Sequence, residues 1–377
     1  MNTEFDIAII GGGIVGLAQG WIAARHGQKV GIFERSSVAQ GASVRNFGMI
    51  WPVGQPAGEM YDIALNSRQL WLEIAAQSNL NIEECGSIHL AHHEDERQVL
   101  REFIDQSTHS TEWISPTEVC SRSALANPNG LLGGMYSPTE LRVNPRTAAE
   151  HIRNWLANNC GVQMHFDTPI TSVNGNELRS SKGKSWTASK IIICSGSDLC
   201  TLFPDNFAAS RLVLCKLQML KSISQPDYSS ATVPHIASGL TLRHYESFAG
   251  CPSLEAVKTR VKQESPLLDE YGIHVMASQF PNGEVILGDS HEYGDNITPF
   301  DKSEIDDLML RELEKVIRLQ DWTIKEKWHG IYAKHPELPI YEEDIDEVVS
   351  LFVGTGGAGM TLSFGLADRY WKKMKGE

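Results

Sequence analysis

The sequence lacks three features, and each absence excludes a class of protein. Its seven cysteines form no CxxC pair, so we expect neither a disulfide framework nor a thiolate zinc site, and interpret the cysteines as buried, reduced thiols. No run approaches eighteen uncharged apolar residues, which argues against a membrane span. Basic residues number 33 against 47 acidic ones, and the net charge of -14 argues against nucleic acid as a partner.

The chain also lacks the charged and apolar regions of a secretory signal, because an apolar strand is predicted to begin by Phe5. We therefore expect a cytoplasmic protein. With 377 residues, of which 41% are hydrophobic, the chain is too long for one ordinary core and suits two closely associated domains. The oligomeric state is left open.

A nucleotide-binding pattern occupies the first 34 residues. The apolar run FDIAII (5–10) leads into GGGIVGL and a helical pattern, and the next strand, KVGIF (29–33), ends on Glu34. Glycines in GxGxxG permit a tight turn, approach of a pyrophosphate and close helix packing, while an acid after the second strand accepts hydrogen bonds from a ribose. The predicted cofactor-binding residues here are Gly11, Gly13, Ile14, Val15, Gly16, Glu34 and Arg35.

The segments after Glu34 do not repeat this βαβ pattern, as a nicotinamide enzyme normally would. A mixed apolar and polar loop, GASVRNFGMIWPVGQP (41–56), precedes a predicted helix over about 56–77. Short strand patterns over 162–187 then lead to the strand SKIIICSGSD (189–198). Near the end, EVVSLFVGTGGAGMTLSFGLADRYW (347–371) again indicates strand, glycine-rich turn and helix. A second helix N-terminus is thus predicted to face a ligand.

Together GGGIVGL with Glu34, ICSGSD and GTGGAGMTLSFG resemble the D-amino-acid oxidase (DAO) superfamily of FAD enzymes, which includes glycine oxidase and sarcosine oxidase. The resemblance covers almost the whole chain. It implies an α/β fold with a Rossmann-like FAD-binding domain of the GR2 or DAO type and an antiparallel-sheet substrate domain. We assign residues 1–82, 142–211 and 328–377 to the discontinuous FAD-binding domain, and residues 83–141 and 212–327 to the substrate-binding domain.

The resemblance also implies which residues contact the flavin. The C-terminal turn would face its pyrimidine edge, and the 41–56 loop would run from the diphosphate to the ring. Gly330 stands where sarcosine oxidase has the cysteine that bonds its flavin, so we expect noncovalent FAD. The implied residues are Ser43, Arg45, Asn46, Phe47, Gly48, Met49, Ile170, Ser195, Gly196, Gly330, Gly356, Gly357, Ala358, Gly359 and Met360.

The form ASVRNFGMIWPVGQP resembles one branch of these oxidases, a branch associated with phosphonate breakdown. The resemblance implies oxidation of an aminophosphonate related to 2-aminoethylphosphonate. In WHGIYAKHPELPIY (328–341) the arginine by which relatives hold a carboxylate is replaced by Ile331 and Tyr332, with Lys334 and His335 close by. A tetrahedral phosphonate can be bound by several separate hydrogen-bond donors, whereas a planar carboxylate favours the two parallel bonds of a guanidinium. The alternative is a carboxylate substrate such as glycine, sarcosine or a D-amino acid. The predicted substrate-binding residues are Arg45, Tyr332, Lys334, Arg243 and His274, and His244 is a further candidate.

An antiparallel sheet that forms a pocket wall is predicted from four further runs of alternating residues. These runs are 212–220, 238–245, 272–280 and 283–290. The cluster HLAHHEDER (89–97) has metal-binding residue types, but we interpret it as a solvated helix start and expect no metal site. The flavin would take a hydride from the carbon beside a neutral amine, so no catalytic acid or base is assigned. O2, giving hydrogen peroxide, or an electron carrier would reoxidise it. An NAD-linked dehydrogenase and a flavoprotein without turnover are the other two function classes.

Overall fold

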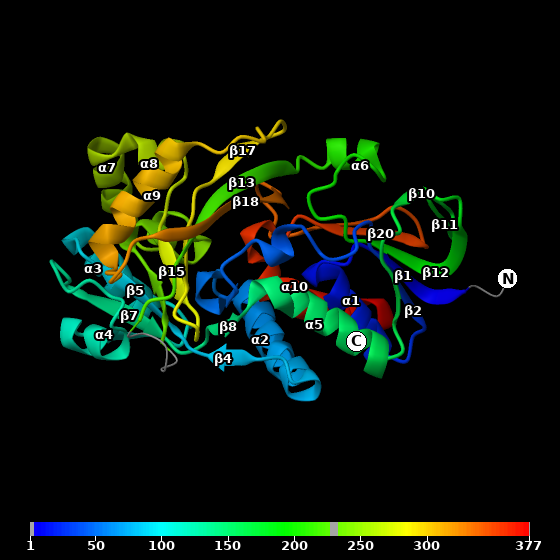
Figure 1. Cartoon of the computed structure of the whole chain (residues 1–377), viewed down its shortest axis with the longest axis horizontal. Coiled ribbons are helices and arrows are strands. Elements are labelled where there is room, and N and C mark those ends of the chain that lie inside the picture. Colours follow the sequence, from blue (N-terminus) through cyan, green and yellow to red (C-terminus); the bar gives the residue numbers. More distant parts are fainter. Residues whose placement is uncertain (1–3, 227–232, 377) are drawn as a thin grey trace.

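The computed structural model describes residues 4–226 and 233–376 and contains two large sheets, of eight and nine described strands, with helices packed around them. Figure 1 shows the sheet of β1, β2 and β12 at one end, the sheet of β5, β7 and β15 at the other, and α10 between them. The helices are α1 (Ile14–Arg25), α2 (Glu59–Ser78), α3 (Glu94–Gln106), α4 (Pro116–Arg122), α5 (Pro145–Asn159), α6 (Pro204–Ala209), α7 (Leu254–Glu264), α8 (Pro266–Glu270), α9 (Ser303–Val316) and α10 (Gly359–Lys375).

The eight-stranded sheet is parallel at its centre. Its strands are β1 (Phe5–Ile10), β2 (Val30–Phe33), β9 (Gln163–His165), β10 (Ile170–Asn174), β11 (Glu177–Ser180), β12 (Ser185–Ile193), β19 (Tyr341–Asp344) and β20 (Val349–Val353). β1 pairs in parallel with β12 and β2. β20 pairs in parallel with β12 on the side opposite β1. The continuous apolar sequence of β1 follows from this position, because a central parallel strand is covered on both faces.

Helix α1 lies so close to β1 that only glycine fits at the third position of GxGxxG. A Cβ built on Gly16 would lie 2.0 Å from the backbone oxygen of Gly11. Helix α10 packs against both α1 and α2, where Phe364 meets Trp21 and Trp71 edge to face at centroid distances of 5.4 and 4.8 Å. The C-terminal strand and helix therefore join the N-terminal unit, as the sequence predicted.

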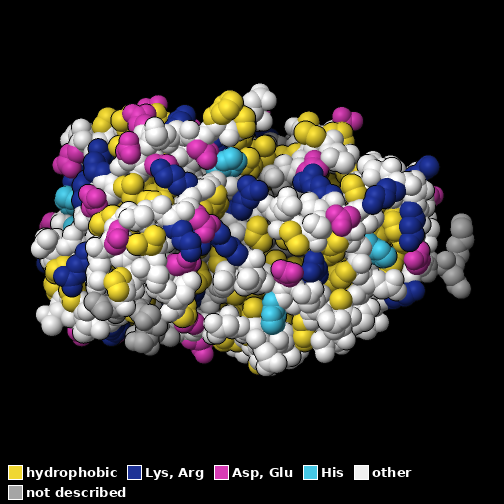
Figure 2. Space-filling model, in the orientation of Figure 1, with side chains coloured by type: hydrophobic (Ala, Val, Ile, Leu, Met, Phe, Trp, Pro, Cys, Tyr) yellow, Lys and Arg dark blue, Asp and Glu magenta, His cyan; other side chains and the backbone are white. Residues whose placement is uncertain are grey.

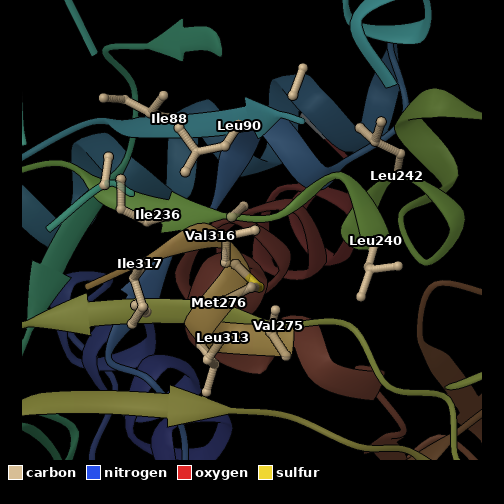
Figure 3. Packing of buried hydrophobic residues seen from close by; sticks show 14 of the residues in the cluster. Ile88, Leu90, Ile236, Leu240, Leu242, Val275, Met276, Leu313, Val316 and Ile317 are labelled. Carbon is tan, nitrogen blue, oxygen red and sulfur yellow. The ribbon is translucent and has the colours of Figure 1, made fainter. Parts of the chain in front are cut away.

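The nine-stranded sheet is antiparallel except where β14 pairs in parallel with β5. Its strands are β5 (Ser87–Ala91), β6 (Glu112–Ile114), β7 (Gly133–Ser137), β13 (Val213–Ser222), β14 (His235–Ala237), β15 (Met276–Gln279), β16 (Val285–Gly288), β17 (Glu292–Gly294) and β18 (Ile324–Lys334). Figure 3 shows its core, in which Ile88, Leu90, Ile236 and Met276 face Leu313 and Val316 of α9. A third, small sheet joins β3 (Met49–Ile50), β8 (Leu141–Val143) and β4 (Ile82–Glu84).

Two details differ from the sequence-based expectations. The predicted strand over 238–245 is instead the 3-10 helix η3 (Gly239–Arg243), because Thr241 bonds back to the Ser238 carbonyl through both its backbone N–H and its hydroxyl. β18 crosses the proposed domain boundary at 328 and pairs with β13 from Ile324 to Lys334. The division into two domains remains our proposal.

The cysteines and the helices bear on the exclusions drawn from composition. All seven cysteines are unpaired; Cys120 and Cys160 are half-buried and Cys200 is exposed, so burial was predicted wrongly for these three. Among the described residues, no helix combines the length and apolar character that a membrane crossing requires. Figure 2 shows acidic and basic side chains interspersed over one face.

Candidate functional site

A cavity of about 1080 Å³ extends between the two sheets and is lined by residues from both. Binding pockets for a single small ligand usually enclose about 300–1000 Å³, so this cavity has room for a cofactor and a substrate. Its walls include Gly11 and Gly13 after β1, the 39–49 loop, the start of α10, Asp289 after β16 and the end of β18.

The turn after β1 opens the N-terminus of α1 toward the cavity. Gly13 precedes the helix without a side-chain cap, and no acidic residue occupies the first turn. The Ser43 hydroxyl accepts a 2.9 Å hydrogen bond from the Ile14 N–H. Glu34 accepts hydrogen bonds from the Gly12 N–H at 2.8 Å and the Ser36 N–H at 3.0 Å. One N–H of this helix start is bonded to Ser43, and the backbone N–H groups beside it are suited to a phosphate.

The 41–49 loop is held in shape by its own polar side chains. The Asn46 amide donates to the carbonyls of Ala42 and Ser43 and accepts from the Gly48 N–H. The Arg45 guanidinium donates to the His329 carbonyl at 3.1 Å, and the Trp328 indole donates to the Arg45 carbonyl at 3.2 Å. These contacts explain why one loop combines polar and apolar residues, since the polar ones fix its path while Phe47 and Met49 line the cavity.

The glycine turn between β20 and α10 forms another wall. Gly356 has a φ of 55°, which favours glycine, and α10 begins at Gly359 without a side-chain cap. The Trp51 N–H donates to the Thr361 hydroxyl at 2.8 Å, and the Trp71 indole donates to the Met360 carbonyl at 2.8 Å. These two hydrogen bonds fasten the segment around Trp51 and helix α2 to the start of α10.

The structure brings most of the predicted site residues together around this cavity. Those that line it are Gly11, Gly13, Ile14, Val15, Glu34, Arg35, Ser43, Arg45, Asn46, Phe47, Met49, Ile170, Ser195, Gly196, His274, Gly330, Tyr332, Lys334, Gly356, Gly357, Ala358, Gly359 and Met360. Gly16, Gly48 and Arg243 do not line it. Gly16 packs against Gly11, Gly48 against the Val143 carbonyl, and Arg243 pairs with Asp269 and the Ile273 carbonyl.

Comparison with known proteins assigns this arrangement to a family. The model of the family DAO, FAD dependent oxidoreductase, matches residues 6–370. The chain belongs to this family. Its fold is therefore the DAO fold, and its cofactor is FAD.

Similar proteins include several glycine oxidases. The glycine oxidase of Geobacillus kaustophilus strain HTA426 is 25% identical over 211 residues, 52% of this chain and 56% of that protein. The alignment thus spans little more than half the length of this relative. The crystal structure of glycine oxidase from Geobacillus kaustophilus has a TM-score of 0.79 at 17% identity, covering 100% of this chain and 96% of that one. The FAD-bound L-alpha-glycerophosphate oxidase of Mycoplasma pneumoniae has a TM-score of 0.78 at 15% identity, covering 100% of this chain and 95% of that one.

The residues of the cavity fit FAD. The α1 end, with its helix start and Glu34, would hold the diphosphate and the adenosine ribose. The α10 end offers a second uncapped helix start, where negative charge on a bound flavin would be stabilised. Noncovalent attachment stays a prediction, favoured by the missing side chain at Gly330.

Removing the Glu34 carboxylate is expected to weaken FAD binding. Glu34→Ala removes the acceptor that a ribose hydroxyl would use, and we expect a loss of about 1–3 kcal/mol in FAD affinity. Equilibrium titration of the apoprotein with FAD measures the change. Because Glu34 also accepts from Gly12 and Ser36, Glu34→Gln, which keeps an acceptor oxygen, should recover part of the affinity. An unchanged affinity in Glu34→Ala would remove Glu34 from the site.

The half of the cavity facing the nine-stranded sheet contains a buried polar group. His244, His274 and His291 stack with centroid distances of 4.0 to 4.9 Å, and Asp289 lies beside them. Burial lowers the pKa of His244 and His274 well below the usual range and that of His291 to about 4. Burial also raises the pKa of Asp289 well above its usual range. At neutral pH the imidazoles are therefore uncharged.

These three histidines are metal-binding residue types, but the stacking of their rings and a nearby positive charge oppose a metal site. Two nitrogens on one tetrahedral zinc lie about 3.3 Å apart, given Zn–N bonds of about 2.0–2.1 Å. Here the candidate ligand atoms lie within 4.8 Å of one another, a looser set, and the rings are inclined by only 17° to 41°. The positive charge of Lys334 lowers the pKa of all three rings, and it would oppose a metal cation as well.

Sequence reasoning named His244 and His274 but missed Asp289 and His291, because the four residues are dispersed over 244–291. His244 follows η3, His274 precedes β15, and Asp289 and His291 follow β16. The available signal was polar residues at strand ends, in GIHVMASQF and GEVILGDSH. Of the other metal-type residues, His89 is buried in β5 beside Trp51, and His93 precedes α3 as its cap.

Proposed function

We propose that this protein uses FAD to oxidise the C–N bond of a small amine that carries an anionic tail. The supporting observation is one cavity in which the FAD end continues into a chamber lined by Lys334, Tyr332 and the imidazole group. FAD supplies the acceptor for a hydride from the carbon beside the amine. The chain's own contribution is to desolvate the amine and to hold that carbon in place. Hydrolysis of the resulting imine gives an aldehyde and an amine or ammonia.

We propose a phosphonate as the tail. The arginines that line the cavity, among the described residues, are Arg35 and Arg45. Arg35 pairs with Asp198 at 2.8 Å and Arg45 donates to the His329 carbonyl, so neither presents an unengaged fork for a planar carboxylate. Lys334 and Tyr332 are point donors, which suit the three oxygens of a tetrahedral phosphonate.

A carboxylate substrate is the second candidate. It is favoured by the names of the similar curated proteins, which are glycine oxidases. In that case Arg45 would have to leave the His329 carbonyl to hold the carboxylate, since Arg243 lies outside the cavity and pairs with Asp269.

A substrate panel separates the two candidates. We expect N-methyl-2-aminoethylphosphonate or a close relative to be oxidised with a kcat/KM at least tenfold above those of sarcosine, glycine and D-alanine. Flavin bleaching under argon measures the amine half-reaction, while peroxide and artificial-acceptor assays in air identify the electron acceptor. If sarcosine or an amino acid is better by tenfold or more, the carboxylate candidate replaces the phosphonate. If none of the amines bleaches the flavin, amine oxidation itself is wrong.

A further inference from the structure

We propose that Asp289 accepts the proton of the substrate's ammonium group, so that the amine is neutral when its carbon is oxidised. This inference rests on the proposed function as an amine oxidase. Amines are mostly protonated at neutral pH, whereas the oxidation needs the nitrogen lone pair. A proton acceptor inside the cavity would remove that obstacle.

Asp289 lies in the part of the cavity where we expect the substrate amine. It directly follows β16, lines the cavity and is only 5% exposed. Its neighbour Gly288 faces Phe47, since a Cβ built on Gly288 would lie 3.4 Å from the Phe47 ring, and Phe47 is the residue expected along the flavin. The backbone of Asp289 is fixed by paired hydrogen bonds with His274 of 3.0 and 3.3 Å.

The Asp289 carboxylate has unused hydrogen-bonding capacity. Among the described residues, its Oδ1 has no hydrogen-bond partner, and neither ring nitrogen of His274 has one. The His274 Nε2 lies 3.5 Å from Oδ1 and the His291 Nε2 lies 3.8 Å from Oδ2, both beyond an ordinary hydrogen bond. Buried polar atoms are rarely left unpaired in native proteins, so such a group indicates a ligand or a function.

The tautomer of His291 indicates that this group can take up one proton. The His291 Nδ1 lies 3.1 Å from the Gly272 carbonyl, which can only accept, so Nδ1 carries the hydrogen. In the neutral ring Nε2 then carries a lone pair, and this nitrogen faces Asp289 Oδ2. Two acceptors that face each other repel, and a proton on Asp289 would relieve this repulsion. The substrate's ammonium group would supply that proton.

The charges around Asp289 suit a zwitterionic substrate. The groups that face it or act on the same cluster are His244, His274, His291, Lys334, Tyr245, Tyr293, Tyr332 and Cys215. Arg243 also acts on His244 and His274, but it pairs with Asp269 and does not line the cavity. Lys334 is the cation that lines the cavity, with its Nζ 5.5 Å from the Tyr293 ring centroid. A substrate with an anionic tail at Lys334 and an ammonium at Asp289 would be matched at both ends.

Desolvation makes the proton transfer feasible. In water an ammonium and an aspartate differ in pKa by about six units, so the proton stays on nitrogen. Burial lowers the pKa of an amine and raises that of a carboxyl group, and it raises the pKa of Asp289 here. Both changes reduce the difference. In the transfer an N–H bond breaks, its electron pair stays on nitrogen, and the proton bonds to a carboxylate oxygen of Asp289.

Asp289→Asn tests the inference, because it keeps the shape and removes the proton acceptor. Anaerobic flavin reduction by N-methyl-2-aminoethylphosphonate, followed from pH 6 to 10, gives the reduction rate constant and the substrate Kd separately. We expect a roughly hundredfold lower ratio of rate constant to Kd near pH 7.5. The loss should shrink to about tenfold or less at pH 10, where the substrate itself becomes the free amine. Glu246→Gln, at an exposed carboxylate on the rim of the same cavity, is the control and should behave as wild type.

The outcomes separate this inference from the proposed function. A variant that matches wild type at pH 7.5, a loss that is equal at every pH, or the same loss in Glu246→Gln would each overturn the role of Asp289. If Asp289→Asn fails to hold FAD, the wild-type pH profile tests the inference instead. A wild-type ratio of rate constant to Kd that falls in proportion to the fraction of free amine down to pH 7 would contradict a proton acceptor inside the cavity. If sarcosine replaces the phosphonate as the better substrate, the same profiles are measured with sarcosine.

Discussion

Lys334→Ala is expected to lower kcat/KM for the anionic amine by about ten- to a thousandfold, mainly through KM. Lys334 ends β18, lines the cavity, and its charge acts on the three imidazoles. Truncating one partner of a fully desolvated charge pair costs about 2–5 kcal/mol. Lys334 is only half-buried, so we expect about 1.4–4 kcal/mol, which corresponds to the ten- to thousandfold loss. Steady-state kinetics on the phosphonate amine and on sarcosine measure the effect, and added salt should reduce the wild-type rate in the same direction.

Two companion variants sharpen this test. Lys334→Arg keeps the charge and should recover much of the loss. Lys325→Ala removes a lysine of the same strand that is half-exposed and pairs with Glu284, so it should leave the kinetics unchanged. Wild-type KM in Lys334→Ala would remove this residue from the substrate site, and the anionic tail would then have to be held by Arg45 or the imidazoles.

Gly16→Val is expected to abolish stable FAD binding. The added Cβ would lie 2.0 Å from the Gly11 carbonyl oxygen, which belongs to the backbone and cannot move aside. Overpacking of a tight core usually costs about 1–3 kcal/mol and sometimes more, and here it displaces the helix start that faces the cofactor. We expect purified protein with little bound flavin and a lower unfolding temperature, measured by absorbance and by thermal melting.

The control is Gly250→Val, because a Cβ at Gly250 meets no atom within 4 Å. This variant should hold FAD and melt like wild type. If Gly16→Val also binds FAD normally, the close packing of α1 on β1 is not what shapes the cofactor end of the cavity.

The sequence by itself determined the elements whose signals are local and ordered. FDIAII, the glycines after it, KVGIF and Glu34 predict strand, turn, helix and strand, because a buried parallel strand is apolar throughout and glycine marks the turn. The same reasoning placed β20 and α10, and the resemblance carried by these motifs identified the family that the match over 6–370 confirms. The incorrect prediction of a strand at 238–245 also has a local cause. Alternating apolar residues at Leu240 and Leu242 fit both a strand and the 3-10 helix that Thr241 stabilises.

Only the tertiary structure decided which dispersed polar residues share one space. His244, His274, Asp289 and His291 come from three segments and meet because η3, β15 and β16 converge at one wall of the cavity. Likewise Arg243 and Lys334 were both predicted to bind the substrate. In the structure Arg243 pairs with Asp269 outside the cavity, while Lys334 lines the cavity. Side-chain partners are set by packing between segments far apart in the chain, and burial then sets their pKa values, so neither is encoded in any local pattern.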